Sequence, residues 1–151
     1  MVRRVKILGV DPGESIGFVV VSYDLATKQM TILNTGVQKF GENSALAARF
    51  FRAQADDSDT YVVENYVINP KVYKHDHQGD KGVALRQIGM LEMLAVEREA
   101  TVVLQMPTVK PPGYGFLGKQ YVRGKKDQHS WDALAHVVFY LVTKQGMQPL
   151  Q

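Results

Sequence analysis

Two apolar runs joined by a tight turn open the chain and constrain its fold more than any other feature. Residues 5–10 and 16–23 are rich in β-branched residues, and Asp11, Pro12 and Gly13 begin the segment between them. Proline and glycine are typical turn residues, so the pattern predicts two antiparallel strands. Because an ionised carboxylate is costly to bury alone, Asp11 must lie at the solvated end of its strand or be held by a cation.

The segments that follow predict an α/β protein with a mixed five-stranded sheet. A third β-rich run over residues 30–38 extends the hairpin, and a helix with Ser44 as its N-cap comes next. This helical crossover predicts that the next strand, over 60–67, lies parallel to the first strand. The later elements are, in order, a helix over 83–98, a strand over 101–105 and a last helix from Asp127 to Lys144. Three antiparallel strands followed by parallel additions, flanked by helices, would form the sheet.

Composition indicates an ordinary globular protein. The 151 residues are 45% hydrophobic and 22% charged, which predicts one domain spanning residues 1–151 with a core of its own. No apolar run approaches the length of a membrane span, and Asp11 interrupts the first apolar run where a signal peptide would continue, so we expect no membrane association and a cytoplasmic location. The sequence has no cysteine, so any metal would be bound by oxygen and imidazole ligands.

Two carboxylates lie near the ends of strands that are predicted to be parallel. Asp11 and Glu64 should both reach the carboxyl edge of the sheet, where open α/β sheets bind ligands. On the last helix, His129 and Asp132 are three residues apart and share one face, with His136 a turn further along. Carboxylates that crowd together raise one another's pKa and need divalent cations to stay ionised. The pattern therefore favours a metal site that includes Asp11.

Each of these residues also has an ordinary structural interpretation. An aspartate begins many turns, and a glutamate at a strand end is often solvated. An aspartate in the first turn of a helix interacts favourably with the helix dipole, and a nearby histidine can face solvent. It is the combination of the four residues at one edge that favours the metal site.

Three short motifs resemble those of a known family. GVDPG around Asp11, VVEN around Glu64 and HSWDALAH from His129 resemble, in the same order, motifs of the RuvC-type Holliday junction resolvases of the RNase H-like superfamily. The resemblance implies an RNase H-like fold with Asp11, Glu64, His129 and Asp132 as catalytic and metal-binding residues. It also implies a homodimer that acts on branched DNA, the four-way junction.

The chemistry that this resemblance implies is that of a crossover junction endodeoxyribonuclease. Such a site supports phosphodiester hydrolysis with two divalent cations. The oxygen-rich ligand set indicates Mg²⁺, two ions per site, and because Mn²⁺ tolerates the imidazole of His129 better, Mn²⁺ should be able to substitute. A proton shuttle is the alternative role for His129, and the sequence does not separate the two roles.

Positive charge is concentrated in two segments. The net charge is only +3, but residues 110–126 carry five cations and no acid, interleaved with aromatic side chains. We predict that this segment is a short loop, where the family has further helical sequence, and that it contacts DNA phosphates. The PTVK sequence that ends at Lys110 also resembles a family stretch in which a lysine contacts DNA. The predicted DNA contacts are Lys71, Tyr73, Lys74 and Lys81 after the fourth strand, and Lys110, Lys119 and Arg123 in the basic segment. A solvated loop is the alternative for both segments.

The helix predicted over residues 83–98 carries two apolar stripes. The first consists of Ala84, Ile88, Leu91 and Ala95, and the second of Leu85, Gly89, Met93 and Val96. Since one stripe suffices to cover the sheet, the second needs a partner. The pattern therefore predicts a symmetric homodimer, which would present two active sites to the two strands of a junction.

Other functions remain open at the level of sequence. A nuclease of the same fold could act on other branched DNA or on structured RNA, as YqgF-type enzymes do. A non-catalytic DNA-binding module would bind without any metal-dependent cutting. An actin-like or sugar-kinase-like nucleotide binder also opens with an aspartate, a glycine and a hairpin, but 151 residues suffice for only one of its two lobes.

Overall fold

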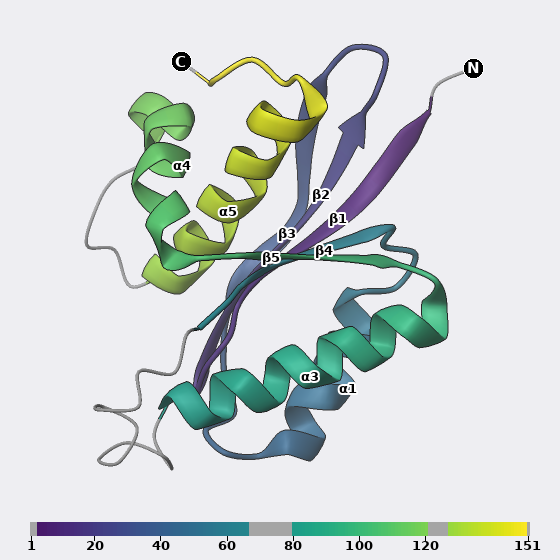
Figure 1. Cartoon of the computed structure of the whole chain (residues 1–151), viewed down its shortest axis with the longest axis vertical. Coiled ribbons are helices and arrows are strands. Elements are labelled where there is room, and N and C mark those ends of the chain that lie inside the picture. The colour runs from purple at the N-terminus through teal and green to yellow at the C-terminus, as the bar shows by residue number, and fades with distance from the viewer. Residues whose placement is uncertain (1–2, 67–79, 121–126, 151) are drawn as a thin grey trace.

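A five-stranded mixed sheet forms the middle layer of the protein, and helices cover both of its faces (Figure 1). The computed structural model describes residues 3–66, 80–120 and 127–150. The strands are β1 (Arg4–Asp11), β2 (Ser15–Asp24), β3 (Gln29–Lys39), β4 (Thr60–Glu64) and β5 (Thr101–Gln105). The helices are α1 (Ser44–Gln54), α3 (Asp80–Arg98), α4 (Lys110–Leu117) and α5 (Gln128–Gln145), with 3₁₀ turns η1 (Pro107–Val109) and η2 (Gly118–Gln120).

The strand order is β3-β2-β1-β4-β5. The first three strands form an antiparallel meander, in which β1 pairs with β2 and β2 with β3. The crossover through α1 then places β4 parallel to β1, and β5 is added parallel to β4. The predicted mixed five-stranded sheet is therefore confirmed.

The sheet separates two hydrophobic cores because side chains alternate along each strand. On β1, Ile7 packs in the core beneath α5, and Leu8 packs in the core beneath α1 and α3. On β4, Val62 and Val63 divide in the same way. Helices α4 and α5 cover one face of the sheet, and α1 and α3 cover the other (Figure 1).

The segment after β5 is helical, where the sequence predicted a loop. In α4 the two prolines, Pro111 and Pro112, lie in the first turn. Proline is tolerated there because the N–H groups of the first turn have no partner within the helix. Gly113 allows α4 to pack closely on α5, since a Cβ atom at this position would meet the backbone carbonyl of Ala135. The residues that usually indicate a loop here begin a helix and permit its packing.

Several element boundaries differ from the predicted ones by a few residues. The side chain of Asn43 accepts a hydrogen bond from the N–H of Leu46, so Asn43 is the N-cap of α1 in place of Ser44. Strand β4 ends at Glu64, which places this carboxylate at the very edge of the sheet. Helix α3 begins at Asp80, a few residues earlier than predicted.

Within the part of the chain that the structure describes, no helix combines the length and the apolar character needed to cross a membrane. The longest helices, α3 and α5, both carry charged and polar side chains along their length. The cytoplasmic location inferred from composition stays a prediction.

Candidate active site

The ends of β1 and β4 place two carboxylates side by side. Val10 is in register with Val63 in the parallel pair, so the next residues, Asp11 and Glu64, lie abreast at the carboxyl edge of the sheet. Alternation along the strands turns both side chains toward the face that α5 covers. Asp11 is 3% exposed and Glu64 is 1% exposed. Two acidic side chains are thus buried next to each other at one edge.

The first turn of α5 lies over this edge and adds His129 and Asp132. Nδ1 of His129 lies 2.8 Å from Oδ2 of Asp11. The helix can approach this closely because the residue opposite Asp11 on β2 is Gly17. A Cβ atom at Gly17 would overlap the backbone carbonyl group of His129. The structure therefore brings together all four residues that the motifs indicated.

Three of these residues form a geometric group that fits a metal ion. One ligand atom from each of Asp11, His129 and Asp132 lies within 4.8 Å of the other two. Two carboxylate oxygens and one imidazole nitrogen are ligands that Mn²⁺ accepts readily, and the carboxylates suit Mg²⁺. Burial penalises the negative charge of the two aspartates, and a divalent cation would offset that cost. The donor set and its burial therefore fit a divalent cation.

Glu64 is held by protein groups on both oxygens. The hydroxyl of Tyr66 donates to Oε2 at 2.9 Å, while Nζ of Lys110 lies 2.8 Å from Oε1 and Nε2 of His136 lies 3.3 Å from the same atom. Burial acts to raise the pKa of Glu64, but the hydrogen bonds that its carboxylate accepts, first among them that of His136, outweigh burial. The pKa of Glu64 is consequently well below its usual range, and the carboxylate is ionised.

Of the two neighbouring carboxyl groups, Asp11 binds a proton more tightly than Glu64 does. Burial raises the pKa of Asp11 to about 7, and the hydrogen bond with His129 opposes this rise only in part. A hydrogen bond to Glu64 and the repulsion from its charge raise the pKa of Asp11 further. Burial also raises the pKa of Asp132, against the opposing charge of Lys110. Without a metal, the site thus disfavours full ionisation of its carboxylates.

Lys110, the first residue of α4, places its ammonium group among these carboxylates. Its Nζ atom contacts Glu64 and lies 3.9 Å from Oδ2 of Asp132. Burial acts to lower the pKa of Lys110, but the Glu64 carboxylate raises it above its ordinary value, so the side chain stays charged. The sequence predicted Lys110 as a phosphate contact in a loop. In the structure it is a half-buried counter-ion of the acidic residues, with its side chain 26% exposed.

A second group of polar residues supports the site. Gln128 donates one hydrogen bond to Oδ1 of Asp132, at 3.0 Å. The buried side chain of Gln87, on α3, bonds to both the N–H and the carbonyl oxygen of Gly13, in the turn that follows Asp11. Sequence reasoning missed both glutamines, because their partners are distant in the chain and a glutamine on a helix is ordinarily solvated. His136 had a signal, its helical spacing from Asp132, but the sequence did not indicate that it is buried.

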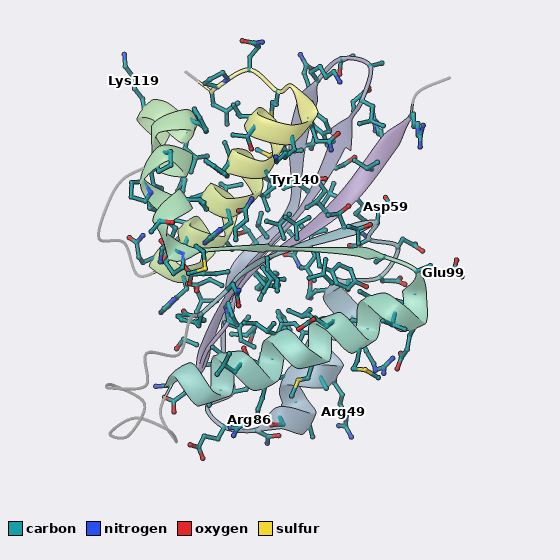
Figure 2. The ribbon with its side chains drawn as sticks, viewed as in Figure 1. Arg49, Asp59, Arg86, Glu99, Lys119 and Tyr140 are labelled. Carbon is teal, nitrogen blue, oxygen red and sulfur yellow. The ribbon has the colours of Figure 1, made fainter. Side chains whose placement is uncertain are left out.

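The other predicted DNA contacts are placed only in part. Lys119 lies in η2, beyond the far end of α4 from Lys110, and Figure 2 shows its side chain projecting away from the sheet. Lys81 lies in the first turn of α3. The remaining predicted contacts lie outside the described residues; they are Lys71, Tyr73, Lys74 and Arg123. The basic segment therefore includes two described lysines in different settings, one within the acidic cluster and one exposed on η2.

Comparison with known proteins identifies the fold. No protein-family model matches the chain, and no curated protein matches it in sequence. Solved structures do match. Thermus thermophilus RuvC in complex with a Holliday junction substrate is 16% identical with a TM-score of 0.59, and the match covers 97% of this chain and 100% of that chain.

Two further resolvases are similar to a comparable degree. The fowlpox virus Holliday junction resolvase is 13% identical with a TM-score of 0.63, covering 92% of this chain and 99% of that chain. The yeast mitochondrial Holliday junction resolvase Ydc2 is 10% identical with a TM-score of 0.63, covering 91% and 78% of the two chains. The structural neighbours are thus RuvC and other Holliday junction resolvases, and the RNase H-like fold predicted from the motifs is confirmed.

Proposed function

We propose that the protein is a metal-dependent endonuclease that resolves four-way DNA junctions by paired phosphodiester hydrolysis. One observation carries the proposal: Asp11, Glu64, His129 and Asp132 converge at one sheet edge in a fold shared with a protein solved on a Holliday junction substrate. The buried carboxylates supply the negative charge that a divalent cation requires. Neither a structural turn nor a solvated strand end would account for their convergence.

The residues of the site have separable parts in this proposal. Asp11, His129 and Asp132 would hold one divalent cation, and Asp11 with Glu64 a second, Mg²⁺ in both cases with Mn²⁺ able to substitute. Bound cations of this kind activate a water molecule and stabilise the leaving oxygen of a phosphodiester. Lys110 contributes a fixed positive charge beside the carboxylates, where a phosphate would approach. His129, with its side chain 48% exposed, ligates a cation or moves a proton to solvent.

A comparison of substrates tests the proposal directly. A labelled four-way junction, a flap, a plain duplex and a structured RNA of matched length are incubated with the protein and Mg²⁺, Mn²⁺ or chelator. We expect cuts in both strands of the four-way junction with either metal and none with chelator. Cutting of RNA in preference to the junction would favour a YqgF-type activity. Junction binding with no cutting under any metal would favour a non-catalytic DNA-binding module.

We also propose that the protein acts as a homodimer formed through α3. The stripe that covers the sheet is buried, whereas on the second stripe Met93 is 63% exposed and Val96 is 76% exposed. Beside this stripe, α1 and α3 border a hollow lined by Ala48, Phe51, Arg52, Gly89, Met90, Met93 and Leu94. An apolar surface next to such a hollow suits a second copy of the same helix pair.

The dimer leads to a prediction for Val96. A specific dimer interface should be occupied at a protein concentration of tens of micromolar. Light scattering at this concentration should therefore give twice the 16.9 kDa mass of one chain. The substitution Val96→Glu should shift the mass to that of a monomer, because it places a charge in an apolar interface. Leu33→Glu, at a position on β3 that is 54% exposed, is the matched control and should leave the dimer intact. A monomeric wild type, or equal effects of the two substitutions, would contradict the interface.

The different settings of two lysines lead to a prediction for DNA binding. Lys119→Ala should lower the slope of log affinity against log salt by about one unit and leave the cutting rate of bound junction unchanged, because it removes a single phosphate contact. Lys110→Ala should instead slow the cutting of bound junction by ~10–100-fold, because it removes the counter-ion of Glu64 and Asp132. Binding at several salt concentrations and single-turnover cutting measure both effects. Indistinguishable behaviour of the two variants would show that Lys110 acts only as a phosphate contact.

A further inference from the structure

A fully buried histidine links the active-site glutamate to the edge strand of the sheet. His136 lies one turn after Asp132 on α5 and is 0% exposed. Its Nδ1 atom lies 2.9 Å from Oε1 of Gln105, and its Nε2 atom lies 3.3 Å from Oε1 of Glu64. Glu64 and Gln105 are directly paired across β4 and β5, so the ring spans two neighbouring strand ends.

The surroundings of His136 exclude a role as a metal ligand in this arrangement. Both ring nitrogens already have partners, and the ring is closed off from solvent, in contrast to His129. The group of ligand atoms formed by Asp11, His129 and Asp132 includes neither Glu64 nor His136, and in the proposed function Glu64 holds a second cation together with Asp11. Any effect of His136 on a bound cation therefore passes through Glu64.

The bonds of His136 restrict how the Glu64 carboxylate is oriented. An ionised carboxylate only accepts hydrogen bonds, so Nε2 of His136 carries the proton that is donated to Oε1. Gln105, itself 9% exposed, presents its carboxamide oxygen Oε1 to Nδ1; because that oxygen can only accept a hydrogen bond, Nδ1 also donates, and this bond fixes the rotation of the ring. Lys110 also contacts Oε1, but it does so from a longer and partly exposed side chain. His136 is thus the rigid partner of this oxygen.

Packing of the core does not by itself require a polar residue at this position. Its neighbours on α5 that face the sheet, Ala133 and Val137, are apolar and fully buried. A buried imidazole with its partners stabilises a fold no better than a well-packed apolar side chain of similar volume. The contact between His136 and Oε1 of Glu64 accounts for a polar side chain at this position.

We propose that His136 is a positioning residue that fixes the carboxylate of Glu64 in the orientation required to bind a divalent cation. This inference rests on the metal site of the proposed function. Hydrogen-bond partners of ligating carboxylates commonly set metal affinity without contacting the metal. The affinity of the site for the cation should therefore depend on His136 as long as Glu64 is present.

The experiment measures Mn²⁺ binding by calorimetry, with no DNA present. His136→Leu removes the donor and should weaken Mn²⁺ binding by about 10–100-fold. His136→Gln, whose amide can still donate to Oε1, should restore part of the affinity. Gln105→Met, which frees the ring to rotate, should weaken binding in the same direction and provides a second variant should His136→Leu fail to fold. Val138→Ala, at a buried apolar position of α5, is the control and should lower thermal stability without changing Mn²⁺ affinity.

A double-variant comparison separates positioning from packing. In a Glu64→Gln background, His136→Leu should cause no further loss of Mn²⁺ affinity, because the carboxylate through which it acts is gone. An equal loss in both backgrounds, or wild-type affinity in His136→Leu and Gln105→Met, would overturn the positioning role and leave the metal site intact. Failure of the wild-type protein to bind Mn²⁺ would overturn the metal site itself, and this inference with it.

Discussion

Cleavage of a four-way junction should fall by about 10³-fold or more when Asp11 is replaced by asparagine, as expected when one member of a catalytic unit is lost. Asp11→Asn is nearly isosteric and keeps the strand end and the turn. It removes the carboxylate that contacts His129 and belongs to the group of ligand atoms that fits a cation. Junction binding without metal should be retained or tightened, because the wild-type acidic cluster repels a phosphate.

The fold of Asp11→Asn should be retained because burial already favours an uncharged side chain at this position. The pKa of Asp11 rises from 3.8 in a solvated chain to about 7 in the folded protein. The folded state therefore binds this proton more tightly, and the stability that the proton contributes is lost as pH rises from 3.8 toward 7. Asparagine does not titrate in this range, so the variant does not lose stability from this group as pH rises. Thermal unfolding in chelator should show its stability relative to wild type increasing through this pH window and becoming constant above it.

The readouts for Asp11→Asn are a native gel for binding and a denaturing gel for cutting, each with Mg²⁺, Mn²⁺ or chelator. Asp127→Asn is the matched control, since Asp127 lies at the start of α5, is exposed and makes no side-chain cap. Glu64→Gln and Asp132→Asn should each resemble Asp11→Asn, and double variants should lose little more than single ones. Substantial cutting by Asp11→Asn would leave Asp11 as a turn residue.

The part of the site that the sequence predicts is the part fixed by regular geometry. Strand alternation and the parallel crossover determine that Asp11 and Glu64 share an edge and a face, and both can be inferred from the positions of apolar runs. Helical spacing likewise determines that His129 and Asp132 are neighbours. These inferences need only the period of each element, which a single sequence contains.

The part that the sequence does not predict depends on contacts between distant segments. Nothing near Lys110 indicates that its ammonium group reaches Glu64, since that contact depends on the packing of α4 against α5. The burial of His136 likewise depends on β4 and β5 lying beneath α5. The local sequence of α4 was also ambiguous. Prolines and glycines are typical of loops, but they also occur where a helix begins and packs closely on another helix. Such features require the assembled fold.

The close approach of α5 to the sheet yields the last prediction, for Gly17. Gly17 is paired with Asp11 across β1 and β2 and lies directly beneath His129. A Cβ atom here would overlap the backbone carbonyl of His129 and would lie 2.6 Å from its Cβ atom. Because backbone atoms cannot rotate away as a side chain can, the first turn of α5 must shift. Gly17→Ala should therefore cost about 1–3 kcal/mol or more in the free energy of unfolding.

The same shift should impair the reaction. It would separate His129 and Asp132 from Asp11, and a displacement of about 1 Å in a catalytic group can reduce a rate by about 10²-fold. The control is Gly36→Ala on the neighbouring strand β3, where the nearest atom to a new Cβ is a ring carbon of Phe18 at 3.2 Å. That side chain can yield, so Gly36→Ala should change stability less and leave cleavage intact. Thermal unfolding and single-turnover cutting of both variants decide the matter: wild-type behaviour of Gly17→Ala would mean that α5 does not rest on β2, and that His129 reaches Asp11 in some other way.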